Sequence, residues 1–282
     1  MVVFLVLVIV IGYMVSWYFA SPAILYVAVA FALLMNITSY WFSDKIVLSM
    51  TGARPITRTE SPELWNVVEN LSITAGLPMP KVYIVADSAP NAFATGRDPE
   101  HAVVAVTSGL LELLDTTELE GVVAHELSHI GNRDMLVMTV AVVLAGFIAI
   151  LADMLMRSML WGGNNNDRGK HPLFLVFAIV GIILAPLAAQ LIKLAVSRKR
   201  EYLADASGAL LTRYPEGLAS ALEKISQAGR PMKRASGATA HLFISDPYGD
   251  TGRRSVGQRI GALFQTHPPA QERIKVLRNM GR

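Results

Sequence analysis

Four long apolar stretches set the hydrophobic pattern of this chain. They cover residues 2–20, 22–42, 135–156 and 172–196. Each is close to the roughly 20 residues that an α-helix needs to cross a bilayer. Only Ser21 separates the first two, so we expect a tight N-terminal hairpin of two transmembrane helices. The pattern predicts a polytopic, mainly α-helical membrane protein with hairpins over residues 1–42 and 135–196.

Two other interpretations are open for these stretches. The first could be a cleaved signal peptide, but no basic segment precedes it and it runs directly into the second. The third and fourth could be buried core helices, because they contain Asp153, Gln190 and Lys193. Polar residues near the end of a span can reach the interface, however, so they do not exclude crossing.

The polar remainder forms two blocks, residues 43–134 and 197–282. In the first block, KVYIVA (81–86) and AVVAVT (102–107) are short and rich in β-branched residues, which predicts two strands. The second block predicts helices, followed by a Gly/Arg-rich loop over 248–261. We therefore expect the polar blocks to form a helical domain with a small β-sheet.

Composition narrows the class of protein. Of 282 residues, 52% are hydrophobic and 17% are charged, whereas a soluble domain has about 25% charged residues. The net charge of +3 and the lack of a dense Lys/Arg run argue against a nucleic-acid partner. The chain has no cysteine, which excludes disulfides and thiolate metal sites and is consistent with a reducing compartment.

One helix carries the candidate chemistry. DTTELEGVVAHELSHI predicts a helix that begins at a capping box of Thr117 and Glu120. His125 and His129 then lie one turn apart on the same face, where both imidazoles can reach one metal ion. Glu126 follows the first histidine, as in the H-E-x-x-H pattern of zinc metalloproteases. An ordinary helix with two histidines is the alternative, since two ligands alone do not make a catalytic site.

A catalytic zinc site has three protein ligands and one open position. SRKREYLADAS (197–207) offers Glu201 as the third ligand. Asp205, one turn later, can accept the free N–H of a ligating histidine. The alternative is a solvated charged helix face, because three basic residues precede Glu201.

The predicted topology places these residues together. Two spans separate His129 from Glu201, so both emerge on the same side of the membrane. Basic residues are more numerous near the span ends on that side: Lys45, Arg54, Arg58, Arg133, Arg198, Lys199 and Arg200. Because positive residues favour the cytoplasm, we expect a cell-membrane protein whose catalytic side is cytoplasmic.

Several longer motifs surround these residues. They are SYWFSDKIVL, GLPMPKVYIV, PNAFATGRDPEHAVVAVTSGLL, VVAHELSHIGNRD, SRKREYLADASGALLT, ATAHLFISDP and THPPAQERI. Over nearly the whole chain, the sequence resembles the HtpX membrane heat-shock metalloproteases, within the wider group that includes the CAAX prenyl endopeptidases.

The resemblance implies a gluzincin-like zinc metalloprotease domain, helical with a small sheet whose edge strand holds extended substrate. We expect that edge strand at or near residues 102–107. The resemblance also implies one Zn²⁺ per chain and roles for five residues: the zinc ligands His125, His129 and Glu201, the general base Glu126, and the histidine partner Asp205.

Four further residues are candidates for the cleft. The tetrahedral oxyanion of peptide hydrolysis needs a donor besides zinc, and we expect His267 or, second, His241 to supply it. Each histidine could instead brace local structure. Asn91 and Phe93, in NAFATG, are candidates for substrate binding, although a turn motif explains them nearly as well.

An edge strand that pairs with backbone gives affinity without demanding particular side chains. We therefore expect cleavage of unfolded or misfolded proteins, including membrane proteins, at the bilayer surface. One alternative is a CAAX-type prenyl-protein endopeptidase with the same zinc chemistry. Another is a non-catalytic membrane scaffold whose zinc is structural and has four protein ligands.

Overall fold

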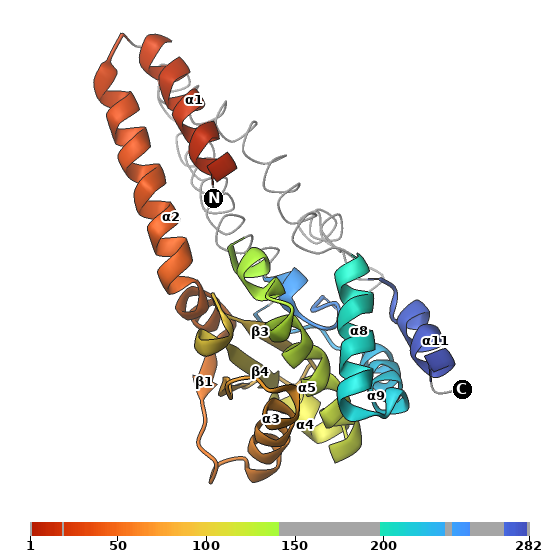
Figure 1. Ribbon diagram of the computed structural model, residues 1–282. Helices are drawn as coiled ribbons and strands as arrows, with labels where there is room; N and C mark the ends of the chain where they lie inside the picture. The colour runs from red at the N-terminus through yellow and green to blue at the C-terminus, as the bar shows by residue number, and fades with distance from the viewer. Residues whose placement is uncertain (1, 19, 141–197, 235–238, 249–267, 281–282) are drawn as a thin grey trace, which may run out of the picture.

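The structure is a computed structural model that describes residues 2–18, 20–140, 198–234, 239–248 and 268–280 (Figure 1). The described part is mainly helical with one small β-sheet, as the sequence predicted. Most of the predicted span 135–156, all of 172–196 and most of the loop 248–261 lie outside the described residues. The second membrane hairpin therefore stays a prediction.

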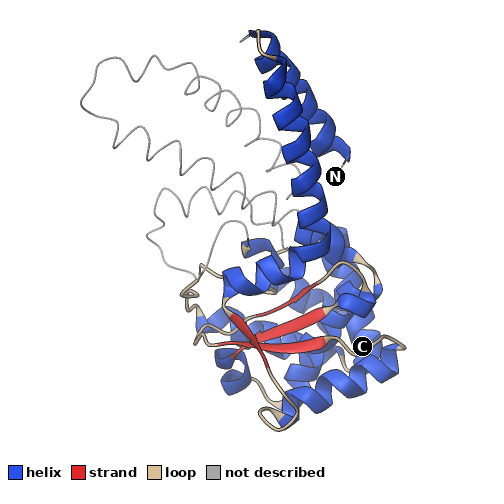
Figure 2. Cartoon of the chain, turned by 90° about the vertical axis from the view of Figure 1, so that its left-hand side faces the viewer, coloured by secondary structure: helices blue, strands red, loops and turns tan. Residues whose placement is uncertain are grey.

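Helices α1 (Val2–Tyr18) and α2 (Pro22–Thr51) form the N-terminal hairpin. The hairpin projects from the rest of the fold (Figures 1 and 2). Among the described residues, one segment, Pro22–Phe42 of α2, is long and apolar enough to cross a membrane. Large apolar side chains of the hairpin are exposed, among them Trp17, Tyr26, Val27 and Leu34.

Helix α2 is longer than the apolar pattern predicts. The predicted span ends at residue 42, but the helix continues to Thr51 and ends at Gly52, whose φ of 70° is the left-handed conformation of a helix C-cap. Val47 and Leu48, in this last part, are buried in the protein core. One continuous helix thus runs from the apolar hairpin into the remainder of the fold.

The sheet contains β1 (Ala53–Pro55), β2 (Lys81–Val85), β3 (Ala92–Thr95) and β4 (Val103–Thr107), in the order β1-β2-β4-β3. β2 and β4 are parallel, while β1 and β3 pair antiparallel to their neighbours. The two predicted strands are confirmed as β2 and β4. The expectation that the edge strand lies at 102–107 is wrong, because β3 pairs with the outer side of β4, and β1 and β3 are the two edge strands.

Other described elements lie around the sheet. They are α3 (Pro62–Ala75), α4 (Ser108–Leu113), α5 (Thr116–Gly131), α8 (Arg198–Thr212), α9 (Pro215–Ala228), α11 (Ala270–Met280), and the 3₁₀ turns η1 (Pro99–His101) and η3 (Ala240–Leu242).

Both faces of the sheet are covered, and β4 shows how (Figure 2). Val104 and Val106 pack into a core formed with residues of α3, α5 and α9. Val103 and Ala105, which point to the opposite face, pack with the lower end of α2 and with Phe243. This two-sided burial explains why residues 102–106 are all apolar instead of alternating between apolar and polar.

The capping box of helix α5 lies two residues before the predicted one. The box consists of Asp115 and Glu118, whose side chains and backbone N–H groups are joined by two reciprocal 3.0 Å hydrogen bonds. The prediction of Thr117 and Glu120 is therefore wrong. The segment offers both spacings, and the tertiary structure selects the earlier one, because buried Glu118 also accepts a 2.6 Å bond from Lys224 of α9.

A glycine allows α5 and α9 to approach closely. A Cβ atom added to Gly121 would lie 2.5 Å from the backbone N of Leu218. We expect Gly121→Ala to lower the thermal unfolding midpoint and to cost about 1–3 kcal/mol, because the clash is with backbone that cannot move aside. Gly131→Ala, in the same helix, is the control, since its Cβ would meet only Leu77 at 3.7 Å. Equal unfolding midpoints for the two variants would contradict this account.

Candidate metal centre and active site

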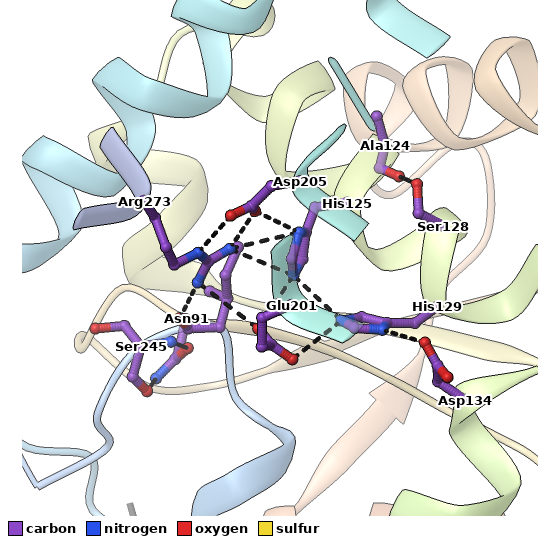
Figure 3. A network of polar contacts seen from close by, with 11 residues as sticks. Asn91, Ala124, His125, Ser128, His129, Asp134, Glu201, Asp205, Ser245 and Arg273 are labelled. Atoms are coloured by element: carbon purple, nitrogen blue, oxygen red, sulfur yellow. Dashed lines mark hydrogen bonds and ion pairs between the residues drawn. The ribbon is translucent and has the colours of Figure 1, made fainter. Parts of the chain in front are cut away.

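Two packed helices bring the three predicted metal ligands together (Figure 3). His125 and His129 lie one turn apart on α5, and Glu201 lies in the first turn of α8. Gly208 makes the approach possible, because a Cβ there would lie only 3.0 Å from the backbone N of His125. The ligand side chains are buried.

The donor atoms of this cluster fit a single metal ion. One donor atom from each of the three side chains lies within 4.8 Å of the others. The two histidine Nε2 atoms are 3.2 Å apart, and the carboxylate oxygens of Glu201 lie 3.8 Å from Nε2 of His125 and 3.6 Å from Nε2 of His129. Zinc bonds of about 2.0–2.1 Å at tetrahedral angles place ligand atoms roughly 3.3 Å apart. Two imidazoles and a carboxylate at these separations suit Zn²⁺.

Asp205 faces the outer nitrogen of His125. Its Oδ1 lies 3.0 Å from Nδ1 of the ring, which leaves Nε2 directed toward the other ligands. Burial, together with the nearby Arg273 charge, lowers the pKa of His125 to about 4 against the opposing effect of Asp205. His125 is therefore neutral at pH 7, which is the form that binds metals.

Asp134 plays the corresponding part for His129. Its Oδ2 lies 3.3 Å from Nδ1 of His129, and its Oδ1 lies 3.6 Å from Nε of Arg200. Burial lowers the pKa of His129, but the bond to Asp134 and the charge of Glu201 outweigh burial and raise it. The sequence pattern did not single out Asp134, although it lies only five residues after His129 in HELSHIGNRD.

Arg273 of α11 is the second residue that the sequence pattern did not reveal. Its side chain is 1% exposed, and its Nε and Nη2 donate to the two carboxylate oxygens of Asp205 at 2.9 and 2.6 Å. Burial alone raises the pKa of Asp205, yet the Arg273 charge and the hydrogen bonds from His125 and Arg273 lower it to about 2. Asp205 is consequently an anion at any physiological pH.

The charges of the described site match a divalent cation. The charged groups around the ligands are the carboxylates of Glu126, Asp134, Glu201 and Asp205 and the guanidinium groups of Arg200 and Arg273. Four negative charges against two positive charges leave −2 when both histidines are neutral. A Zn²⁺ ion neutralises that charge in a buried environment, where an unbalanced charge is costly.

Glu126 lies on α5 directly beside the first ligand. Its side chain is 2% exposed, and its charge contributes to the raised pKa of His129. A carboxylate that close to the ligands is placed to exchange a proton with a water bound among them. The geometry thus has the parts of a hydrolytic metal centre.

Comparison with known proteins identifies the family. Residues 58–281 match the family described as Peptidase family M48. The matched segment runs from α3 to the end of α11 and includes the three predicted ligands. The chain belongs to peptidase family M48. It is therefore a metalloprotease, as the H-E-x-x-H pattern predicted.

Relatives in two distant organisms agree. The chain is 53% identical over 242 residues to "Protease HtpX homolog" of Tropheryma whipplei, covering 86% of this chain and 80% of that protein. It is 52% identical over 256 residues to "Protease HtpX homolog" of Pyrococcus furiosus, covering 90% of this chain and 86% of that protein. The resemblance to HtpX proteases is confirmed.

One solved structure shares the fold. The crystal structure of S. mikatae Ste24p superposes with a TM-score of 0.52 at 17% sequence identity. The match covers 96% of this chain but 62% of Ste24p, so this chain corresponds to less than two thirds of that protein's length. At this identity the similarity concerns the fold alone.

Two predicted cleft residues of this M48 peptidase, Asn91 and Phe93, are buried against other parts of the protein. Asn91 precedes β3, is 2% exposed, and uses its amide to bond the backbone of Ser245. Phe93, in β3, is buried with its ring edge-to-face against Phe243. Both therefore contact the protein's own chain, and their roles in substrate binding stay predictions.

The two candidate oxyanion donors lie in different parts of the chain. His241 lies in η3, two residues before Phe243, which packs on β3. His267 lies outside the described residues, directly before Pro268. The role of each histidine in catalysis stays a prediction.

Proposed function

We propose that this M48 peptidase is a multi-pass, zinc-dependent endopeptidase of the cell membrane that cleaves unfolded or misfolded proteins at the cytoplasmic surface. The observation that carries the proposal is the buried cluster of His125, His129 and Glu201 with Glu126 beside it. The same fold carries an apolar helical hairpin whose second helix is continuous with the protein core.

The residues of the centre have distinct parts in peptide hydrolysis. His125, His129 and Glu201 would hold Zn²⁺, which supplies Lewis acidity toward the scissile carbonyl and lowers the pKa of water. Glu126 accepts the proton of the attacking water and then delivers it to the leaving amine. Asp205 and Asp134 keep the two imidazole rings in orientation by accepting from their outer nitrogens.

Several features support the membrane location. The outward side chains of α1 and α2 are large and apolar, as lipid-facing residues are. We assign the apolar stretches of 1–42 and 135–196 to two hairpins, and residues 43–134 and 197–282 to a single protease domain. The excess of Lys and Arg beside the span ends on the domain side supports a cytoplasmic orientation.

Strand β3 supports the choice of unfolded substrates. Thr107 donates to the carbonyl of Asn91, so by the alternation of antiparallel pairing Ala92 and Ala94 direct their backbone groups away from β4. The carbonyl of Ala92 accepts from Ile244. We assign the backbone of Ala94 to pairing with an extended substrate, which requires unfolded chain but no particular side chain.

The alternative enzyme is a CAAX-type prenyl-protein endopeptidase, which would use the same zinc chemistry. The experiment compares hydrolysis of a denatured, fluorescently labelled protein with that of a farnesylated CAAX peptide, using the zinc-loaded protein in detergent. We expect the denatured protein to be cut at several sites and the prenylated peptide to be cut no faster than its unprenylated form. Removal of zinc by a chelator should stop cleavage, and re-addition should restore it.

Cleavage restricted to the prenylated peptide would replace the proposal with the alternative. A protein that holds zinc but cuts neither substrate would favour the scaffold interpretation. Buried Glu126 beside the three ligands argues against a scaffold, because a structural zinc site has no need of a base.

A further inference from the structure

A short segment of the chain lies against the edge strand. We call residues 242–245 the strap. Its Ile244 N–H donates to the carbonyl of Ala92 at 3.0 Å, and Asn91 bonds both backbone groups of Ser245, at 3.2 and 3.0 Å. Leu242, Phe243 and Ile244 are each at most 3% exposed. The strap is thus a built part of the fold that borders β3.

Arg273, drawn in Figure 3, also contacts the strap. Its Nη1 donates to the carbonyl of Ile244 at 3.3 Å, while Nε and Nη2 hold the carboxylate of Asp205. Asp205 in turn contacts Nδ1 of His125. A single guanidinium therefore connects the strap beside the edge strand with a ligand of the metal centre.

The geometry of the carboxylate explains what the guanidinium does. Oδ2 of Asp205 is bonded by Nε of Arg273, and Oδ1 is shared by Nη2 and the His125 ring. With both oxygens held, Asp205 cannot rotate, and the ring plane of His125 is held with it. A lysine offers one point charge and lacks the fixed fork that bonds both oxygens and a carbonyl at once.

We propose that Arg273 is a positioning residue that couples the metal centre to the strap. The inference rests on the proposed function, because it assumes that His125 binds zinc. The competing explanation is a buried ion pair that merely joins α11 to α8. The two explanations predict different results. If Arg273 couples the two sites, zinc binding orders the strap, and by thermodynamic linkage an ordered strap strengthens zinc binding to the same extent.

The first measurement is zinc affinity by competition with a chromophoric chelator. We expect Arg273→Gln to weaken zinc binding by about 10- to 100-fold, the usual effect of losing a group that orients a ligand. The control is Arg278→Gln, in the same helix, whose side chain is exposed and paired with Glu216 and Glu223. Asp205→Asn should weaken binding similarly, and the double variant should show much less than the product of the two losses.

The second measurement is hydrogen exchange of the strap, followed by mass spectrometry with and without zinc. We expect zinc to slow exchange of residues 242–245 in the wild type and in Arg278→Gln, but not in Arg273→Gln. If the ion pair is only structural, Arg273→Gln would change the exchange rate of the strap relative to the wild type by the same factor with and without zinc. Equal zinc protection in wild type and Arg273→Gln would overturn the proposal.

The design separates failure of the inference from failure of the proposed function. A wild type that binds no zinc would overturn both. A wild type that binds zinc, with unchanged affinity in a folded Arg273→Gln, would overturn the inference alone. If Arg273→Gln does not fold because it leaves Asp205 unpaired, the double variant has no unpaired charge. If the double variant binds zinc with wild-type affinity, and zinc slows hydrogen exchange of its strap as in the wild type, the inference is overturned as well.

Discussion

Replacing Glu126 with glutamine is expected to abolish peptide hydrolysis while zinc binding stays at the wild-type level. Glutamine has the same shape but cannot accept a proton from the attacking water. General base catalysis contributes about 10²- to 10⁴-fold, and Glu126 also serves as the acid for the leaving amine. We therefore expect kcat for a denatured protein substrate to fall by at least about 10³-fold.

The measurement follows hydrolysis by equal amounts of zinc-loaded wild type and Glu126→Gln. Glu120→Gln is the matched control, because it makes the same chemical change on the same helix at a partly exposed position away from the ligands. That control should retain full activity. Equal cutting by wild type and Glu126→Gln would point to a contaminating protease. Loss of zinc from Glu126→Gln would make Glu126 a ligand and refute its assignment as the base.

Replacing Glu201 with glutamine is expected to remove both zinc and activity. The amide oxygen carries no negative charge, and the buried site would lose the anion that faces both histidines. Zinc binding free energies of about 10–16 kcal/mol in fully ligated sites correspond to several kcal/mol for each ligand. We expect zinc affinity about 10²- to 10³-fold weaker, and no hydrolysis above background at micromolar zinc.

Zinc content after dialysis, measured beside chelator competition, checks the Glu201 result. The loss should exceed that of Asp205→Asn, because Glu201 is a ligand and Asp205 acts through His125. Excess zinc should restore part of the activity of Glu201→Gln but none of that of Glu126→Gln. Retention of wild-type zinc affinity by Glu201→Gln would exclude it as the third ligand and leave the two histidines without the partner that α8 supplies.

The sequence predicted most of the candidate site because the positions of its residues depend on spacing within single helices. Residues four apart on a helix share a face, so the pairing of His125 with His129 follows from their spacing alone. Glu201 was found from its own motif, together with the topology of the apolar stretches. The strands β2 and β4 were recognised by their β-branched composition, and the family by the motifs around the ligands.

Other features depend on which distant segments pack together. The predicted edge at 102–107 is an inner strand, because β3, only four residues long, pairs outside it. Hydropathy predicted a span that ends at residue 42, and the candidate span in α2 has that end, but the helix itself continues to Thr51, where Val47 and Leu48 pack in the core. The capping box shifted to Asp115 and Glu118 for a similar reason, the contact of Glu118 with α9.

The sequence alone therefore determined the family, the candidate spans and the candidate ligands, since each depends on local motifs, on composition or on spacing within a helical turn. Only the tertiary structure placed Arg273 in the site, 68 positions along the chain from its partner Asp205. The tertiary structure likewise showed that Asp134 contacts His129 and that Asn91 bonds the strap. These contacts depend on how helices and strands pack against one another, and periodicity along the chain does not predict that packing.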